Sequence, residues 1–336
     1  PIRALGVPVT CLGITGSLGA LAALPRLIGL LRRSKPDLVQ CWMYHANLMG
    51  GLAALLAGRP KVIWGLRQSD IDPVLQKRST VALARLGARL SRCLPDAIAC
   101  VSHSAREVHA AIGYDPARLV VVPNGFDLDV FRPDAAARAE LRAELGLGEA
   151  TVLIGLAARF DPQKDIGNFL AAGRTVADGE PAAHFLLCGE GMDAANRELA
   201  AMIAAAGLAG RVHLLGRRSD MARVTAALDI AVNSSSFGEG FSNALGEALC
   251  CAVPAVATEV GDARIIIGEA GRIVPPRDAP ALAAALLELI ALGPAGRARL
   301  GALGREQMRK DYALAAIAAR YRRLYDRVLV AGPVGE

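Results

Sequence analysis

The stretch NSSSFGEGFSNALGE, residues 233–247, predicts a strand end, a tight glycine turn and the start of a helix. Gly238 and Gly240 flank Glu239, so the backbone can turn sharply there and approach a ligand closely. Ser242 is a favourable helix N-cap residue. The free N–H groups just after it would point out of the helix start, where an anion binds well. The segment therefore predicts an anion-binding turn.

Two carboxylates accompany this turn. Glu239 lies just ahead of the predicted anion site, and Glu247 lies about one helical turn deeper. A carboxylate beside a phosphate would be repelled, so we expect each Glu to accept hydrogen bonds from sugar hydroxyls instead. The alternative is a solvated surface loop followed by an ordinary helical Glu.

A basic loop follows the predicted strand 151–158. Arg159 and Lys164 are five residues apart at the carboxyl end of this strand, where two cations can clamp a diphosphate. The alternative is a plain basic surface loop. Two further loops close strands of the same part of the chain, at 188–191 and 215–218. Through Gly189, Glu190 and Arg217 they are candidates for a nucleotide-base pocket, although plain strand-to-helix turns are the simpler interpretation.

The whole chain alternates short apolar runs with longer amphipathic runs, which predicts βαβ units and parallel sheets. We expect two doubly wound, Rossmann-like domains that face each other across a cleft, where ligands bind outside the carboxyl ends of the strands. The predicted division is 1–132 and 133–315, with a final helix at 316–336 that returns to the first domain. The first strand is expected at 7–12, and the chain looks as if it enters this domain part-way.

Composition narrows the function classes. The 336 residues suffice for two domains, and 53% of them are hydrophobic. Only 4% are aromatic, which argues against single-stranded nucleic acid as a partner because its binding needs stacking platforms. The seven scattered cysteines favour a reducing, cytoplasmic setting. No apolar run reaches the roughly 20 residues that cross a bilayer.

The net charge of +6 favours an anionic partner. The predicted helix 76–93 carries much of this charge on one face, so it could lie on an anionic membrane surface. A solvated basic helix face is the simpler alternative. His45 and His103 follow predicted strands of the first domain and could reach the cleft, although a structural role is more common for such residues.

Taken together, these residues resemble family 4 retaining glycosyltransferases of the group 1 type. The sequence EGFSNALGE at 239–247 resembles the family's motif of two Glu residues separated by seven others. Further similar segments follow the family's order over about 120–320, namely Pro123–Asp127, Arg159 with Lys164, Ala248–Thr258, Val260–Asp262 and Gly271–Pro276.

The resemblance implies a GT-B fold and a nucleotide-sugar donor bound mainly by the second domain. It implies that Glu239 contacts the donor sugar, Glu247 the ribose, and Arg159 and Lys164 the diphosphate. The remaining donor-binding residues that it implies are Gly240, Phe241, Ser242, Asn243 and Ala244. It also implies that no cofactor and no metal are needed, since the two cations replace a metal, and that transfer retains the anomeric configuration.

The first domain departs from the family pattern. The glycine-rich loop after the family's first strand is missing. Many members also carry a His after the strand matching Lys61–Leu66, where this chain reads Leu66-Arg67-Gln68-Ser69-Asp70. Candidates for the acceptor side are therefore His45, Arg67, Asp70 and His103.

The expected function is transfer of a hexose from a nucleoside-diphosphate sugar to a saccharide or lipid-linked saccharide, as in cell-surface polysaccharide synthesis. Such an enzyme would be cytoplasmic or peripheral on the inner face of the plasma membrane. Two alternatives stay open, a nucleotide-sugar-binding protein without transferase activity and a GT-B sugar-nucleotide epimerase. The base and sugar of the donor, and the acceptor, also stay open.

Overall fold

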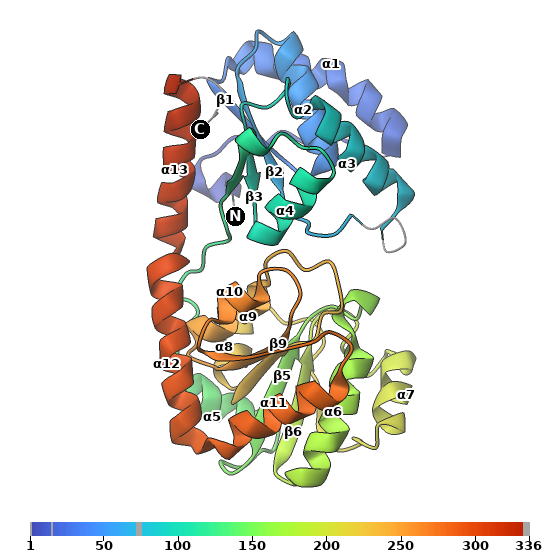
Figure 1. The fold of residues 1–336 in the computed structure, drawn as a ribbon, viewed down its shortest axis with the longest axis vertical. Coiled ribbons are helices and arrows are strands. Elements are labelled where there is room, and N and C mark those ends of the chain that lie inside the picture. The colour runs from blue at the N-terminus through green and yellow to red at the C-terminus, as the bar shows by residue number, and fades with distance from the viewer. Residues whose placement is uncertain (1, 15, 72–75, 332–336) are drawn as a thin grey trace.

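The computed structural model describes residues 2–14, 16–71 and 76–331. These residues form two lobes, each built on one parallel β-sheet with helices on its faces (Figure 1). This arrangement confirms the predicted α/β class with two Rossmann-like lobes. The lobes meet along the edges at which their strands end.

The first lobe holds a four-stranded sheet in the order β1-β2-β3-β4. Its central strand β2 reads KVIWGL and is buried except at its first residue, as expected for a strand covered on both faces. The strands are β1 (Leu38–Trp42), β2 (Lys61–Leu66), β3 (Ala97–Cys100) and β4 (Leu119–Val121). The helices are α1 (Gly16–Ser34), α2 (Tyr44–Leu56), α3 (Arg78–Leu90) and α4 (His103–Ala111).

The second lobe holds a six-stranded sheet in the order β10-β9-β8-β5-β6-β7. Strand order reverses between β5 and β8, which is the point where doubly wound sheets open a ligand crevice. The strands are β5 (Val152–Ala157), β6 (Ala183–Cys188), β7 (Val212–Leu214), β8 (Ile230–Asn233), β9 (Ala255–Thr258) and β10 (Gly271–Val274). The helices are α5 (Ala135–Glu144), α6 (Ile166–Gly179), α7 (Arg197–Ala205), α8 (Met221–Ala226), α9 (Asn243–Cys250), α10 (Ala263–Ile267), α11 (Ala279–Ala291) and α12 (Gly293–Asp311).

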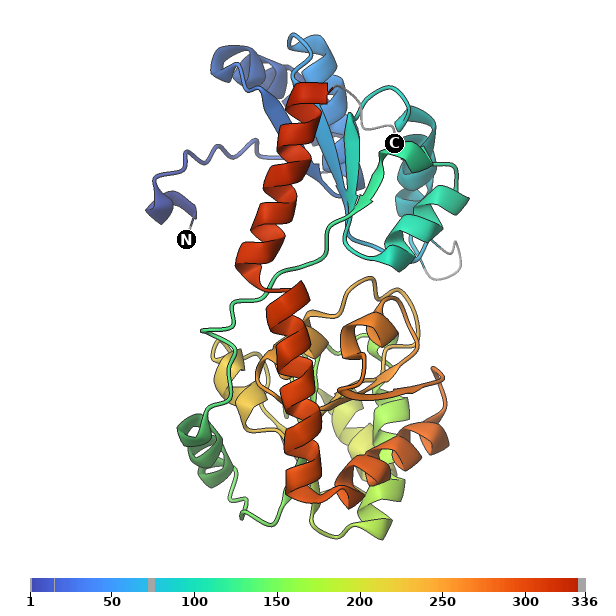
Figure 2. The same ribbon diagram turned by 60° about the vertical axis from the view of Figure 1, so that its left-hand side comes forward.

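The chain crosses between the lobes twice, and the two crossings lie side by side (Figure 2). At the first crossing, the Phe126 N–H donates to the Tyr312 carbonyl at 2.9 Å, and the Leu314 N–H donates to the Phe126 carbonyl at 2.8 Å. At the second, α13 (Leu314–Ala331) continues from α12 and packs on the first-lobe sheet. Its buried Leu324 and Val328 share a hydrophobic cluster with β2 and β3. Residues 332–336 of the predicted final helix lie outside the described residues.

Two sequence expectations differ from the structure. The predicted strand at 7–12 is wrong, because these residues form no strand and are largely exposed, with Val7 at 49% and Val9 at 41%. Helix α12 was not predicted, because its glycines weaken a helix signal. Those glycines are needed for close packing: a Cβ at Gly301 would lie 1.8 Å from the Ala252 carbonyl oxygen, and one at Gly304 would lie 2.7 Å from Leu249.

None of the described helices is long and apolar enough to cross a bilayer alone. Among them, only the pair α11 and α12, bent by 107°, has the required length and composition when the two are joined.

Candidate functional site

A pocket of about 360 Å³ lies between the two lobes at the switch point of the second sheet. It brings together several residues that the sequence placed in a donor site. Those lining it are Arg159, Lys164, Glu239, Gly240, Phe241 and Asn243. Arg67, a candidate for the acceptor side, lines the same pocket from the first lobe. Val101, Asn124, Gln163 and Gly238 complete the lining.

The start of α9 provides backbone donors at this pocket. Ser242 is buried and is the N-cap, and its Oγ accepts the Leu245 N–H at 3.4 Å. The Gly246 N–H makes a backbone bond to the Ser242 carbonyl at 3.3 Å. Asn243 and Ala244 are the first two residues of the helix, so their N–H groups have no acceptor within it. They are therefore suited to hold an anion.

Lys164 and Glu239 form an ion pair inside the pocket. Their side chains are only 18% and 14% exposed, and Ser235 Oγ lies 2.8 Å from the same Glu239 Oε2. Lys164 is the last residue of the short 3-10 turn Pro162–Lys164. Asp161 caps this turn by accepting the Gln163 N–H. A bound diphosphate would compete with Glu239 for this ammonium group.

Arg159 stands at the mouth of the pocket with its side chain 60% exposed, 3.3 Å from Asp161. The loop that follows Arg159 is bonded to the loop at 188–191, which was predicted to contribute to a base pocket. The Phe160 N–H donates to the Glu190 carbonyl at 2.8 Å. Gly189 has φ +142°, and a Cβ there would lie 2.0 Å from the Ala158 carbonyl oxygen, so only glycine fits. Glu190 and Arg217 are exposed and do not line the pocket.

Glu247 lies one turn into α9 and is half-buried. It does not line the interlobe pocket. Burial raises the pKa of its carboxyl group from 4.5 to about 7, because a low-dielectric environment disfavours the charged form. Near neutral pH this carboxyl therefore changes charge easily.

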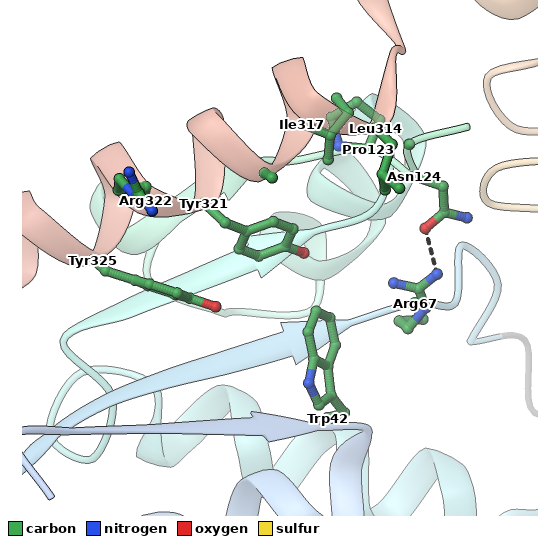
Figure 3. A pocket seen from close by; sticks show the side chains of 11 residues that line it. Trp42, Arg67, Pro123, Asn124, Leu314, Ile317, Tyr321, Arg322 and Tyr325 are labelled. Atoms are coloured by element: carbon green, nitrogen blue, oxygen red, sulfur yellow. Dashed lines mark hydrogen bonds between the residues drawn. The ribbon is translucent and has the colours of Figure 1, made fainter. Parts of the chain in front are cut away.

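Arg67 reaches the pocket from the end of β2. Its guanidinium lies 5.4 Å from the centre of the Trp42 ring, within the range of a cation–π contact, and it donates a hydrogen bond to Asn124 (Figure 3). Asn124 Nδ2 in turn donates to Asn243 Oδ1 at 2.7 Å. The first lobe is thus hydrogen-bonded to the first residue of α9 through the linker.

A second pocket of about 590 Å³ adjoins the first and shares Arg67 and Asn124 with it. Aromatic side chains from β1 and α13 stand around it, and Trp42 and Tyr321 meet edge to face with ring centroids 5.9 Å apart (Figure 3). Trp42, Tyr321 and Asn124 were not predicted as site residues. The only available signals were the position of Trp42 at a strand end and the Pro-Asn-Gly turn around Asn124.

The remaining acceptor-side candidates lie at the first lobe's edge. Asp70 is half-buried, and its Cβ is 3.7 Å from where a Cβ on Gly238 would lie, so it faces the donor loop. His45 and His103 are exposed in the first turns of α2 and α4 and line neither pocket. Among the described residues, no group of three or more His, Cys, Asp or Glu side chains is arranged to hold a metal ion.

Both halves of the chain match known protein families. The family described as Glycosyltransferase Family 4 matches residues 4–130, and the family described as Glycosyl transferases group 1 matches residues 151–291. The UDP-Gal:alpha-D-GlcNAc-diphosphoundecaprenol alpha-1,3-galactosyltransferase of Escherichia coli is 27% identical over 263 residues, which are 77% of this chain and 67% of that enzyme. The D-inositol 3-phosphate glycosyltransferase of Mycobacterium bovis is 32% identical over 65% of this chain. The chain spans 46% of the length of that mycobacterial relative.

Solved structures show the same architecture. Anabaena Alr3699/HepE in complex with UDP superposes with a TM-score of 0.86 at 21% identity, over 97% of this chain and 88% of that one. The sucrose-phosphate synthase of Thermosynechococcus elongatus superposes with a TM-score of 0.79 at 22% identity, over 93% of this chain and 79% of that one. These likenesses establish the GT-B fold, and with the two family matches they show that the chain belongs to the group 1, family 4 glycosyltransferases.

Proposed function

We propose that this protein moves a hexose from a UDP-sugar to a saccharide or lipid-linked saccharide with retention of anomeric configuration. The observation that carries the proposal is the grouping of Arg159, Lys164 and Glu239 around the start of α9 in one interlobe pocket. UDP is supported by the Escherichia coli relative, whose name specifies a UDP-sugar donor and a lipid-linked acceptor.

The chemistry assigned to the pocket is stabilisation of the departing diphosphate. Arg159, Lys164 and the N–H groups of Asn243 and Ala244 would bind its oxygens and stabilise the negative charge that develops on them. We propose that the two cations supply the charge that a metal supplies elsewhere. Turnover is then expected to continue in the presence of a chelator.

Retention is proposed without a covalent intermediate on Glu239. The Ser235 hydroxyl contacts the Glu239 carboxylate, which lowers its strength as a nucleophile and suits it to accepting sugar hydroxyls. The bond between the sugar C1 and the diphosphate oxygen would break, and the acceptor oxygen would bond to C1 from the same face. The acceptor's proton would pass to the departing diphosphate.

Substitution of Lys164 tests the donor site. We expect Lys164→Ala to weaken UDP binding by about 10- to 100-fold, because one charge-assisted contact is lost. The matched control is Lys61→Ala, which removes a lysine paired with Asp96 at the start of β2. Isothermal titration with UDP measures both variants, and thermal shifts with UDP, GDP and ADP test the base. Unchanged UDP binding by Lys164→Ala, or no shift with any nucleotide, would contradict the assignment.

Glu247 gives the site a pH dependence. We propose that its carboxylate accepts hydrogen bonds from the ribose hydroxyls, which stabilises the ionised form and lowers the pKa in the complex. The pKa of Glu247 in the free protein is about 7. Below that pH, binding of the nucleotide sugar should therefore ionise Glu247 and release its proton. The affinity for UDP-glucose is therefore expected to rise between pH 6 and 8.

A variant that cannot ionise provides the control for this pH dependence of the affinity. Glu247→Gln keeps the shape but cannot ionise, so its affinity for UDP-glucose should be flat over the same range. UDP-glucose is used because its diphosphate has no ionisable group between pH 6 and 8. Equal pH dependence in both proteins, measured by titration calorimetry, would remove Glu247 from the site.

We propose further that the first lobe rests on an anionic membrane, where a lipid-linked acceptor would be found. Residues 76–95 contain five Lys or Arg residues and no Asp or Glu. Helix α3 buries Val81 and Ala84 and exposes Arg85, Leu86 and Arg89. A groove of about 600 Å³ runs beside these arginines and is also lined by Arg92 and Ile112. Basic groups beside an exposed apolar side chain suit a membrane interface.

Vesicle flotation tests this surface. The triple variant R85Q/R89Q/R92Q should bind phosphatidylglycerol vesicles about 100-fold more weakly, since each basic residue contributes about 1 kcal/mol near an anionic surface. The control R174Q/R264Q/R309Q removes the same charge from exposed, ion-paired sites in the second lobe. Equal binding by the two triple variants would show that net charge alone is responsible. No binding by the unmodified protein would exclude the proposal.

A further inference from the structure

One buried carboxylate of the second lobe binds the backbone of the first. Asp262 lies in the turn between β9 and α10, and it is 5% exposed. Its Oδ2 accepts the His103 N–H at 2.7 Å, and its Oδ1 accepts the Ser104 N–H at 2.9 Å. His103 and Ser104 are the first two residues of α4, which stands directly above α10 across the junction of the lobes (Figure 1).

This contact completes the N-terminus of α4. The first N–H groups of a helix have no partner inside it. Ser102 is the N-cap, and its Oγ accepts the Ala105 N–H at 3.0 Å. The two preceding N–H groups donate to Asp262. A negative charge at this end also interacts favourably with the positive end of the helix dipole. The cap of α4 is therefore complete only while the two lobes are together.

The same turn supports the donor loop from behind. The Asp262 N–H donates to the Gly240 carbonyl at 3.2 Å. Gly261 has φ +62°, and a Cβ there would lie 1.8 Å from the Glu239 carbonyl oxygen. Only glycine allows so close an approach in that conformation. The position of Asp262 is thus fixed against the backbone of the loop that carries Glu239.

The first lobe presses on the other side of this loop. A Cβ on Gly240 would lie 3.2 Å from Val101 Cγ1 and 3.4 Å from Ser102 Oγ. Val101 and Ser102 immediately precede the helix whose N-terminus Asp262 caps. The donor loop is therefore held between the turn of Asp262 and the start of α4.

We propose that Asp262 is a positioning residue, which holds the lobes closed and so fixes Glu239 for sugar transfer. It lines neither of the two pockets and would act through α4 and the donor loop. The inference rests on the proposed function, because it assigns Asp262 a part in the transfer step. Donor binding by the second lobe alone does not require it.

The chain offers a matched control for this carboxylate. Asp278 caps α11 within the second lobe, and only its Oδ1 is used, by the Ala281 N–H at 2.9 Å. Asn is as good an N-cap as Asp, so Asp278→Asn should be silent. At Asp262 both oxygens are used, so Asp262→Asn would place an amide NH₂ against a backbone N–H. Asp262→Ala removes both bonds.

Three measurements on the full chain test the inference. With UDP, we expect Asp262→Asn and Asp262→Ala to keep the dissociation constant within about twofold of the unmodified protein, while kcat falls about tenfold or more. Small-angle X-ray scattering with saturating UDP should give both variants a larger radius of gyration. Asp278→Asn should match the unmodified protein in all three, and circular dichroism confirms that each variant is folded.

Two results would overturn the inference, and a third would overturn the proposed transfer. A kcat for both Asp262 variants equal to that of Asp278→Asn would overturn the inference. A loss of UDP affinity as large as the loss of kcat would also overturn it, because Asp262 would then only support the donor loop. If the unmodified protein binds UDP but transfers no sugar, the proposed transfer fails, and the scattering comparison alone decides whether Asp262 closes the lobes.

Discussion

The N–H groups at the start of α9, which have no acceptor within the helix, are the constraint on which the site depends. They lie beside the switch point between β5 and β8, where strand ends of the second sheet diverge and leave a crevice. Arg159 and Lys164 follow β5, and Glu239 precedes α9, so the topology brings two cations and a carboxylate to the same helix end. The first lobe then closes the crevice from the other side.

Lys164 and Glu239 balance each other's charge before any ligand binds. Lys164 neutralises Glu239 in a pocket where both side chains are largely covered, which avoids an unpaired charge in a partly dry environment. A diphosphate would draw Lys164 toward itself and free the Glu239 carboxylate for the sugar. Binding and the preparation of the sugar-contacting group would therefore be coupled through one ammonium group. The raised pKa of Glu247 adds a second charge that binding can change.

Local parts of this structure could be predicted from the sequence, and parts that depend on lobe placement could not. Ser242 as N-cap and the glycines around Glu239 follow from neighbouring residues, and the structure has that cap where it was expected. Asn124, Trp42 and Asp262 are separated from their partners by long stretches of chain, and no spacing rule connects them. Residues 7–12 were expected to form a strand and do not. This prediction was wrong because a strand-like run of residues does not reveal whether a neighbouring strand is there to pair with it.

Transfer of a sugar with retention by the pocket at α9 fixes the configuration of the new linkage. The most direct measurement is the proton NMR spectrum of the product formed from a UDP-α-hexose and a lipid-diphosphate-linked saccharide. Retention gives an α-linked product, recognised by the small coupling constant of its new anomeric proton in a gluco- or galacto-configured sugar. A β-linked product with a large coupling constant would contradict it.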